Sequence, residues 1–205
     1  MRNALYRGRC TRMLDKLCCS PEFLIATGRS INKERMKDQY VVLRAMAFLM
    51  LHRGEFKDIP ALQYRGDIDD FLARFMVYVN DNAPEKLIVD YENLFIRCMQ
   101  ISYDLLGENG FRFSGNGIRR PINMPLFEAL SYLFSFVPEK IDYTWASRLI
   151  LDIESVKEEF DDSRYFSGNI DSTTSVSFRF DRMDKIINRL SLIHISEPTR
   201  HSLIS

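Results

Sequence analysis

The chain has 205 residues, of which 46% are hydrophobic, so it is long and apolar enough to bury the core of one domain or slightly more. Lysine plus arginine and aspartate plus glutamate each total 28, which leaves no net charge. A global positive field that attracts nucleic acid is therefore excluded, and such binding would need a local basic patch. The cysteines lack metal-ligand spacing and a disulfide framework, which predicts reduced thiols in a cytoplasmic protein. They are Cys10, Cys18, Cys19 and Cys98.

Two short helices are predicted first. One should begin near Arg9, because apolar residues then recur at the spacing of a single helical face. Ser20 is a good N-cap and Pro21 suits the first helical position, so a second helix should follow to Ala26. Gly28 is expected to end it. The apolar positions of the first helix are Met13, Leu14, Leu17 and Cys18.

The central element is predicted to be a helix from Asp38 to Leu51. From Tyr40 to Leu51 every residue except Arg44 is apolar, and a helix that is apolar on all sides belongs inside a domain. A membrane span is the alternative, but the run is shorter than the roughly 20 residues that a bilayer requires and Arg44 lies in its middle. A buried guanidinium needs an acceptor, and Asp38 is a candidate.

A pair of amphipathic helices joined by a short turn is expected next. Asp67 can cap the first, whose apolar residues recur at steps of three and four up to Val79. Pro84 should open the second, which runs to Leu106. Such a pair is the helical hairpin of an antiparallel bundle. The buried stripe of the second helix is predicted to be Leu87, Tyr91, Leu94, Cys98, Ile101 and Leu105.

The last part of the chain predicts three more helices. Pro125 should start one that Pro138 stops, and Asp142 can cap the next, with Ile141 and Ala146 as a hydrophobic staple. A loop then leads to a last helix, predicted from Ser175 to Arg189. The expected fold is an all-α, irregular bundle of about seven helices around the central apolar helix. The buried stripes of the last two helices are expected to be Trp145, Leu149, Ile153, Val156 and Phe160, then Val176, Phe180, Met183 and Ile187.

A glycine- and arginine-rich segment between Glu108 and Asn123 departs from the helical pattern. Its glycines and Pro121 favour a turn or a short, irregular β-hairpin. Arginines beside aromatic residues on a loop can hold phosphates while the rings stack on bases. The alternative is that the phenylalanines enter the core and the arginines face water or pair with carboxylates of the helices. The candidate nucleic-acid-binding residues are Arg112, Arg119, Arg120, Phe111 and Phe113.

Other residues that could carry chemistry have a structural interpretation that we favour. His52 lies at a helix C-terminus, where the helix dipole would favour its charged form, and a catalytic role is the lesser alternative. Asp67, Asp69 and Asp70 could suggest a metal site, but carboxylates in a first helical turn suit the dipole without an ion. No phosphate-binding glycine motif, nucleophile elbow or zinc spacing occurs in the sequence. No catalytic residue and no metal ligand are therefore predicted.

The segment Arg35-Met36-Lys37-Asp38-Gln39, followed by Leu43-Arg44 and Ala47-Phe48, resembles the helical part of the GmrSD-like family of ParB-like nucleases. The opening Arg2-Asn3-Ala4-Leu5-Tyr6-Arg7-Gly8 is similar to the junction that closes the nuclease domain of that family. The likeness marks Arg35, Asp38 and Arg44 as a structural motif. The family usually has an acidic residue where this chain has Tyr40. Lys33, Arg35 and Lys37 form a basic strip that is either solvated or in contact with the nuclease domain.

The resemblance implies that catalysis belongs to an upstream ParB-like domain with an Asp-Gly-Gln-Gln-Arg motif, which this sequence does not contain. It also implies a parent protein that restricts foreign or modified DNA, with a nucleoside triphosphate and a divalent metal as cofactors of the parent and none in this chain. We expect a helical accessory region whose partners are that nuclease domain and DNA, with no membrane contact. The alternative is a stand-alone helical module for protein interaction.

The C-terminus is predicted to lie outside the fold. Residues 190–200 match, codon by codon, the in-frame translation of a transposase sequencing adapter, and such segments are set aside in fold prediction. The expected organisation is a junction remnant over residues 1–8, a helical domain over residues 9–189 and an adapter-derived tail over residues 190–205.

Overall fold

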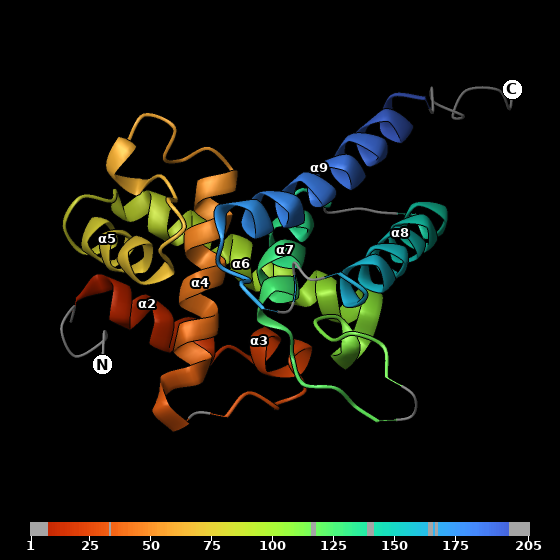
Figure 1. Cartoon of the computed structure of the whole chain (residues 1–205), viewed down its shortest axis with the longest axis horizontal. Helices are drawn as coiled ribbons and strands as arrows, with labels where there is room; N and C mark the ends of the chain where they lie inside the picture. Colours follow the sequence, from red (N-terminus) through yellow and green to blue (C-terminus); the bar gives the residue numbers. More distant parts are fainter. Residues whose placement is uncertain are drawn as a thin grey trace, which may run out of the picture.

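The computed structural model describes residues 8–32, 34–115, 118–138, 142–163, 166 and 168–196 (Figure 1). These residues form eight α-helices and three short 3-10 turns, and no strand occurs among them, so the all-α prediction is confirmed. The hairpin considered for the glycine- and arginine-rich segment is wrong for its described residues, which form an irregular loop after a 3-10 turn. The α-helices are α2 (Arg9–Cys18), α3 (Pro21–Ala26), α4 (Lys37–His52), α5 (Ile68–Asp81), α6 (Glu85–Leu106), α7 (Met124–Phe134), α8 (Tyr143–Asp161) and α9 (Thr173–Ser196), and the 3-10 turns are η1 (Glu34–Met36), η2 (Pro60–Leu62) and η3 (Gly107–Asn109).

Helix α4 is the centre of the molecule, as predicted. It contacts α2, α5, α6 and α7, which surround it in Figure 1. Every residue from Val41 to Met50 is buried, because the sequence leaves this helix no polar face for water. Leu43 and Phe48 are 2% and 0% exposed. None of the described helices is long and apolar enough to cross a membrane.

The predicted helix starts are confirmed by their caps. The Ser20 hydroxyl accepts a hydrogen bond from the amide of Phe23, and the Asp142 carboxylate accepts one from the amide of Trp145. Asp67 accepts from two amides in the first turn of α5. Each cap satisfies a donor that the helix start leaves unpaired, so each fixes where its helix begins. Ile141, the predicted staple residue, lies outside the described residues.

The buried stripe of α6 differs from the prediction. Tyr91 and Cys98 are buried as expected, but Leu87, Leu94 and the other two predicted positions, Ile101 and Leu105, are only half-buried. Helix α6 packs against α3 and α7, and Phe95 on its buried face contacts Phe23 of α3 and Phe127 of α7. A hydrophobic pattern predicts that a face is buried but not towards which neighbour it turns. The buried residues are Ile88, Tyr91, Glu92, Phe95, Cys98, Met99 and Ser102.

Helices α7, α8 and α9 complete the bundle on the side away from α2 and α5 (Figure 1). Helix α7 packs against α4, α6 and α9 and is buried from Pro125 to Phe134. All five predicted core positions of α8 are buried. In α9, Ile187 is half-buried and its neighbour Ile186 takes the buried position instead.

The C-terminal helix continues past the predicted boundary at Arg189. Helix α9 reaches Ser196, and Leu190 is only 6% exposed and belongs to the hydrophobic core. Leu190 lies one helical turn after Ile186, so it extends the same buried stripe. The part of the chain that packs therefore includes a residue that the sequence assigns to the tail.

Arg44 is buried and paired, but Asp38 is not its partner. The Arg44 guanidinium bonds to Glu128 on α7, with Nε to Oε1 at 2.5 Å, and to Asp171, with Nη2 to Oδ1 at 2.6 Å. Asp38 lies almost two turns before Arg44 and faces another side of the helix, where its carboxylate accepts from the Gln39 amide. The side chain of Arg35, the third residue of the predicted motif, lies outside the described part of the structure.

Candidate anion-binding pocket

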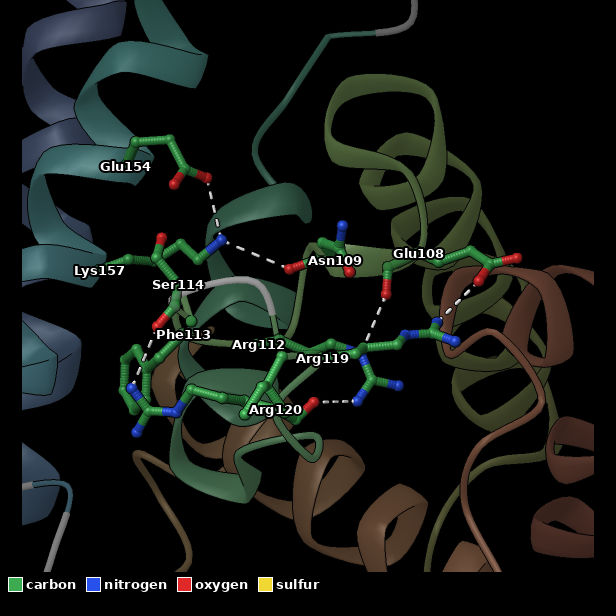
Figure 2. Close-up of a pocket in the computed structure, with 11 residues that line it drawn as sticks. Glu108, Asn109, Arg112, Phe113, Ser114, Arg119, Arg120, Glu154 and Lys157 are labelled. Carbon is green, nitrogen blue, oxygen red and sulfur yellow. Dashed lines mark hydrogen bonds and ion pairs between the residues drawn. The ribbon is translucent and has the colours of Figure 1, made fainter.

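A cavity of about 640 Å³ opens where η3, the loop after it and α8 meet. It brings together the three arginines that the sequence selects and a lysine that it does not. Figure 2 shows these side chains, with Glu154 and Lys157 projecting from α8 and Glu108 and Asn109 from the end of the α6 region. The charged residues that line the cavity are Arg112, Arg119, Arg120, Lys157, Glu108 and Glu154.

Arg112 fixes the loop to the rest of the molecule. Its side chain is 4% exposed, and it donates to the carbonyl oxygens of Glu108 and Thr27, each at 3.2 Å. It also donates to the Arg120 carbonyl and to the Ser30 hydroxyl. All four acceptors are uncharged, so none of these bonds neutralises the guanidinium. Burial, and then the nearby charge of Arg119, lower the pKa of Arg112.

Phe111 and Phe113 belong to the core and are not available to stack on bases. They are 0% and 6% exposed. The ring of Phe111 lies 4.3 Å from that of Phe127, and the ring of Phe113 packs edge-on against Phe166 at 5.8 Å, both distances between ring centroids. The stacking part of the nucleic-acid prediction is therefore wrong for these two rings, because the apolar interior provides a better environment for them than the loop surface.

Arg119 and Arg120 form the exposed rim of the cavity. Arg119 pairs with Glu108 at 2.7 Å, and the two side chains are 44% and 52% exposed. Arg120 pairs with Asp161 and lies over the Phe113 ring, 5.3 Å from its centroid. Exposed ion pairs of this kind contribute only about 0 to 1 kcal/mol, so either arginine can exchange its carboxylate for another anion at little cost.

Lys157 lies deeper in the cavity. Although charged, it is 5% exposed, and its Nζ donates to Oε1 of Glu154 at 2.9 Å and to the carbonyl oxygen of Asn109 at 3.4 Å. The sequence holds a signal for it, because Lys157 follows Ile153 by one helical turn and so lies on the buried stripe of α8. A lysine on a buried face must reach either an acceptor or a cavity.

Away from the cavity, His52 has a packing role. Its ring stacks on Phe180, with centroids 3.6 Å apart and planes 11° from parallel, and its Nε2 is buried without a hydrogen-bond partner in the described structure. Burial, and then the charge of Arg179, lower the pKa of His52 to about 3. The prediction that the helix dipole favours a charged His52 is therefore wrong, because burial outweighs the dipole.

Among the described residues, metal-binding and thiol groups give no second site. Asp67 accepts from the amides of Asp69 and Asp70 at 2.9 and 3.0 Å, which confirms its capping role. No group of three histidine, cysteine, aspartate or glutamate residues within the described ranges could hold a metal ion. The cysteines are free thiols, and burial raises the pKa of Cys10 and Cys98 to about 12.

Comparison with known proteins gives no match. No family model matches the chain, and neither a curated protein nor a solved structure matches it significantly. The proposed function therefore rests on the cationic cavity and on the sequence resemblance of residues 35–48.

Proposed function

We propose that this chain is the helical accessory region of a DNA-targeting nuclease of the GmrSD-like type, and that it binds nucleic-acid phosphates at the cationic pocket. The observation that carries the proposal is the convergence of Arg112, Arg119, Arg120 and Lys157 on one cavity of a chain without net charge. Lysine and arginine contacts to phosphate supply most of the affinity for nucleic acid that does not depend on sequence.

The resemblance of the central segment supports the nuclease part of the proposal. Arg44, one residue of the motif, is buried on helix α4 and pairs with Glu128, and Asp38, another, is 9% exposed at the start of the same helix. In this assignment the catalytic motif, the nucleoside triphosphate and the divalent metal belong to the upstream domain of the parent protein. The purified chain is accordingly expected to bind DNA without cleaving it.

Burial of the two phenylalanines changes the binding mode expected from the sequence. Without Phe111 and Phe113 as stacking platforms, contact with nucleic acid depends on charge and on the arginine forks alone. Such binding is weak, sensitive to salt and tolerant of sequence, because phosphates carry no sequence information.

A stand-alone module for protein interaction is the second candidate. Helix α8 exposes two large hydrophobic side chains, Tyr143 at 87% and Leu151 at 72%. Exposed apolar side chains on one helix are a feature of protein-binding surfaces when they form a patch. Failure of the chain to bind nucleic acid would favour this candidate.

The test is fluorescence anisotropy of a labelled single-stranded oligonucleotide with the full chain at about 50 and 200 mM salt. The double variant Arg119→Ala/Arg120→Ala should weaken binding and reduce the salt slope by about 0.7 for each phosphate that is no longer neutralised. Arg112 is kept, because it fixes the loop. The control Arg65→Ala/Arg148→Ala removes the same charge from exposed positions elsewhere and should leave the slope unchanged. Binding that ignores salt and the double variant would overturn the proposal.

A further inference from the structure

We infer that the pocket takes the terminal phosphate of a nucleic-acid strand, a phosphomonoester, in preference to the phosphodiester backbone. This inference rests on the proposed function, since it names the part of the nucleic acid that the same site recognises. The inference goes beyond the proposed function. Binding to the backbone of a nucleic acid needs only an exposed basic surface, whereas this pocket has exposed cations at its rim and buried cations inside.

The charged side chains around the pocket can hold a doubly charged group. The lining has four cationic side chains and two carboxylates, Glu108 and Glu154, and a third carboxylate, Asp161, pairs with Arg120, so one positive charge is in excess. A phosphomonoester carries about −1.5 to −2 at pH 7, whereas each backbone diester carries a single negative charge. One backbone phosphate matches this excess, whereas a terminal phosphate also carries the charge to replace an exposed carboxylate such as Glu108 at Arg119.

The burial of two of the cations favours a strand end over a backbone phosphate as the ligand. Arg119 and Arg120 have side chains 44% and 40% exposed and can contact a strand that crosses the rim. Lys157 and Arg112 are 5% and 4% exposed, so only a group that enters the cavity can reach them. A volume of about 640 Å³ falls within the range of small-ligand sites, and it admits the end of a strand but not a duplex.

Lys157 retains capacity for a ligand. An ammonium group has three donors, and the described structure gives this one two acceptors, of which the Asn109 carbonyl at 3.4 Å is a long contact. Figure 2 shows its Nζ between Glu154 and Asn109, on the side of the cavity opposite the Arg119 guanidinium. A phosphate oxygen at this point would gain a charge-assisted hydrogen bond, which is among the stronger hydrogen bonds in proteins.

A cut strand has the end that this pocket fits. Hydrolysis of a phosphodiester by water leaves one phosphomonoester end and one hydroxyl end. The reaction class that supplies the ligand of this pocket is thus phosphodiester hydrolysis, and the pocket would hold the phosphorylated end after the parent protein has cut.

The experiment compares three single-stranded oligonucleotides of identical sequence with a 5′-phosphate, a 3′-phosphate or two hydroxyl ends. At pH ~7.5 a phosphorylated end should bind about tenfold more tightly than the hydroxyl ends, as expected for one added charge-assisted hydrogen bond. Lys157→Met keeps the length of the side chain and should abolish the preference for a phosphorylated end. The control is Lys185→Met at an exposed position of α9, which should retain the preference.

A pH arm tests the charge of the ligand. The second pKa of a phosphomonoester is about 6, so the preference should fall between pH ~7.5 and ~5.5. Competition by inorganic phosphate should fall in parallel. Sulfate stays doubly charged over this pH range, so its competition with the phosphorylated oligonucleotide should persist. It therefore controls for titration of Glu108, Glu154 and Asp161 around the four cations.

The results separate the inference from the proposed function. Equal affinity for phosphorylated and hydroxyl ends, with binding still weakened in Arg119→Ala/Arg120→Ala, would overturn the inference and leave the proposed function in place. A preference that survives Lys157→Met would overturn the assignment of the terminal phosphate to this pocket. Failure of all three oligonucleotides to bind would overturn both. The preference for a phosphorylated end is measured first on the unmutated chain. The inference is therefore tested even if a variant fails to fold.

Discussion

Nε of Arg44 on α4 lies 2.5 Å from Oε1 of Glu128 on α7, and these two residues are 84 positions apart in the chain. Both side chains are buried, at 2% and 0% exposure, and the second oxygen of Glu128 accepts from Nη2 of Arg179 on α9 at 2.9 Å. One carboxylate thus joins three helices. Burial alone would lower the pKa of Arg44, but the charges and hydrogen bonds of Glu128 and Asp171 raise it instead.

Replacing Glu128 by glutamine should cost about 3 to 5 kcal/mol of unfolding free energy, because two buried guanidinium groups would lose their shared carboxylate. Urea denaturation of the full chain measures this loss. Glu159→Gln is the matched control, because Glu159 pairs with Arg182 where both side chains are about a third exposed. The control should cost less than about 1 kcal/mol. Equal losses in the two variants would show that the buried ion pairs do not hold the helices together.

Truncation of Leu43 to alanine should cost about 2 to 5 kcal/mol, because the side chain is 2% exposed in the central helix and its removal leaves a cavity. Leu151→Ala on α8 makes the same chemical change at a position 72% exposed and should stay within about 0.5 kcal/mol. The difference in unfolding free energy is measured from the urea denaturation midpoints of the two variants, compared at equal m-values. A loss for Leu43→Ala as small as that for Leu151→Ala would mean that α4 is not the centre of the core.

His52 should make the protein less stable as the pH falls. Its folded pKa of about 3 lies below its ordinary value of 6.5, so the unfolded chain binds a proton first and stability is lost progressively below pH ~6.5. The loss amounts to a few kcal/mol at most. Unfolding free energies at several pH values between about 7.5 and 4 should fall more steeply for the unmutated chain than for His52→Phe. Parallel curves would contradict a neutral His52 with a buried Nε2. The comparison cancels the contribution of His194 and His201, because both histidines are present in the two chains.

Two shortened chains, ending at Arg189 and at Leu190, should differ in stability. Leu190 packs in the core, so the chain that retains it should be more stable by about 1.5 to 3 kcal/mol, the value of burying one leucine. The chain ending at Leu190 should melt close to the full chain if residues 191–205 form the tail that the sequence predicts. A melting temperature several degrees below that of the full chain would show that residues beyond Leu190 contribute to the fold.

Local features of this protein follow from its sequence alone. The caps at Ser20, Asp67 and Asp142 were predictable because a cap depends on donors within a few residues of the capping side chain. The burial of α4 was predictable because a helix that is apolar on every side has no other stable environment in water. Both features depend on residues that are close together in the chain, so the order of residues in the sequence is enough to predict them.

Which distant groups meet depends on the packing of the helices. Glu128, not the nearby Asp38, neutralises Arg44, because α7 lies against the face of α4 from which the arginine projects. Lys157 joins the three arginines because α8 packs beside the loop after η3. Phe113 turns inward because Phe166 offers it an apolar contact. The energies of buried charges and rings depend on distances in space, and these distances exist only once the helices have packed.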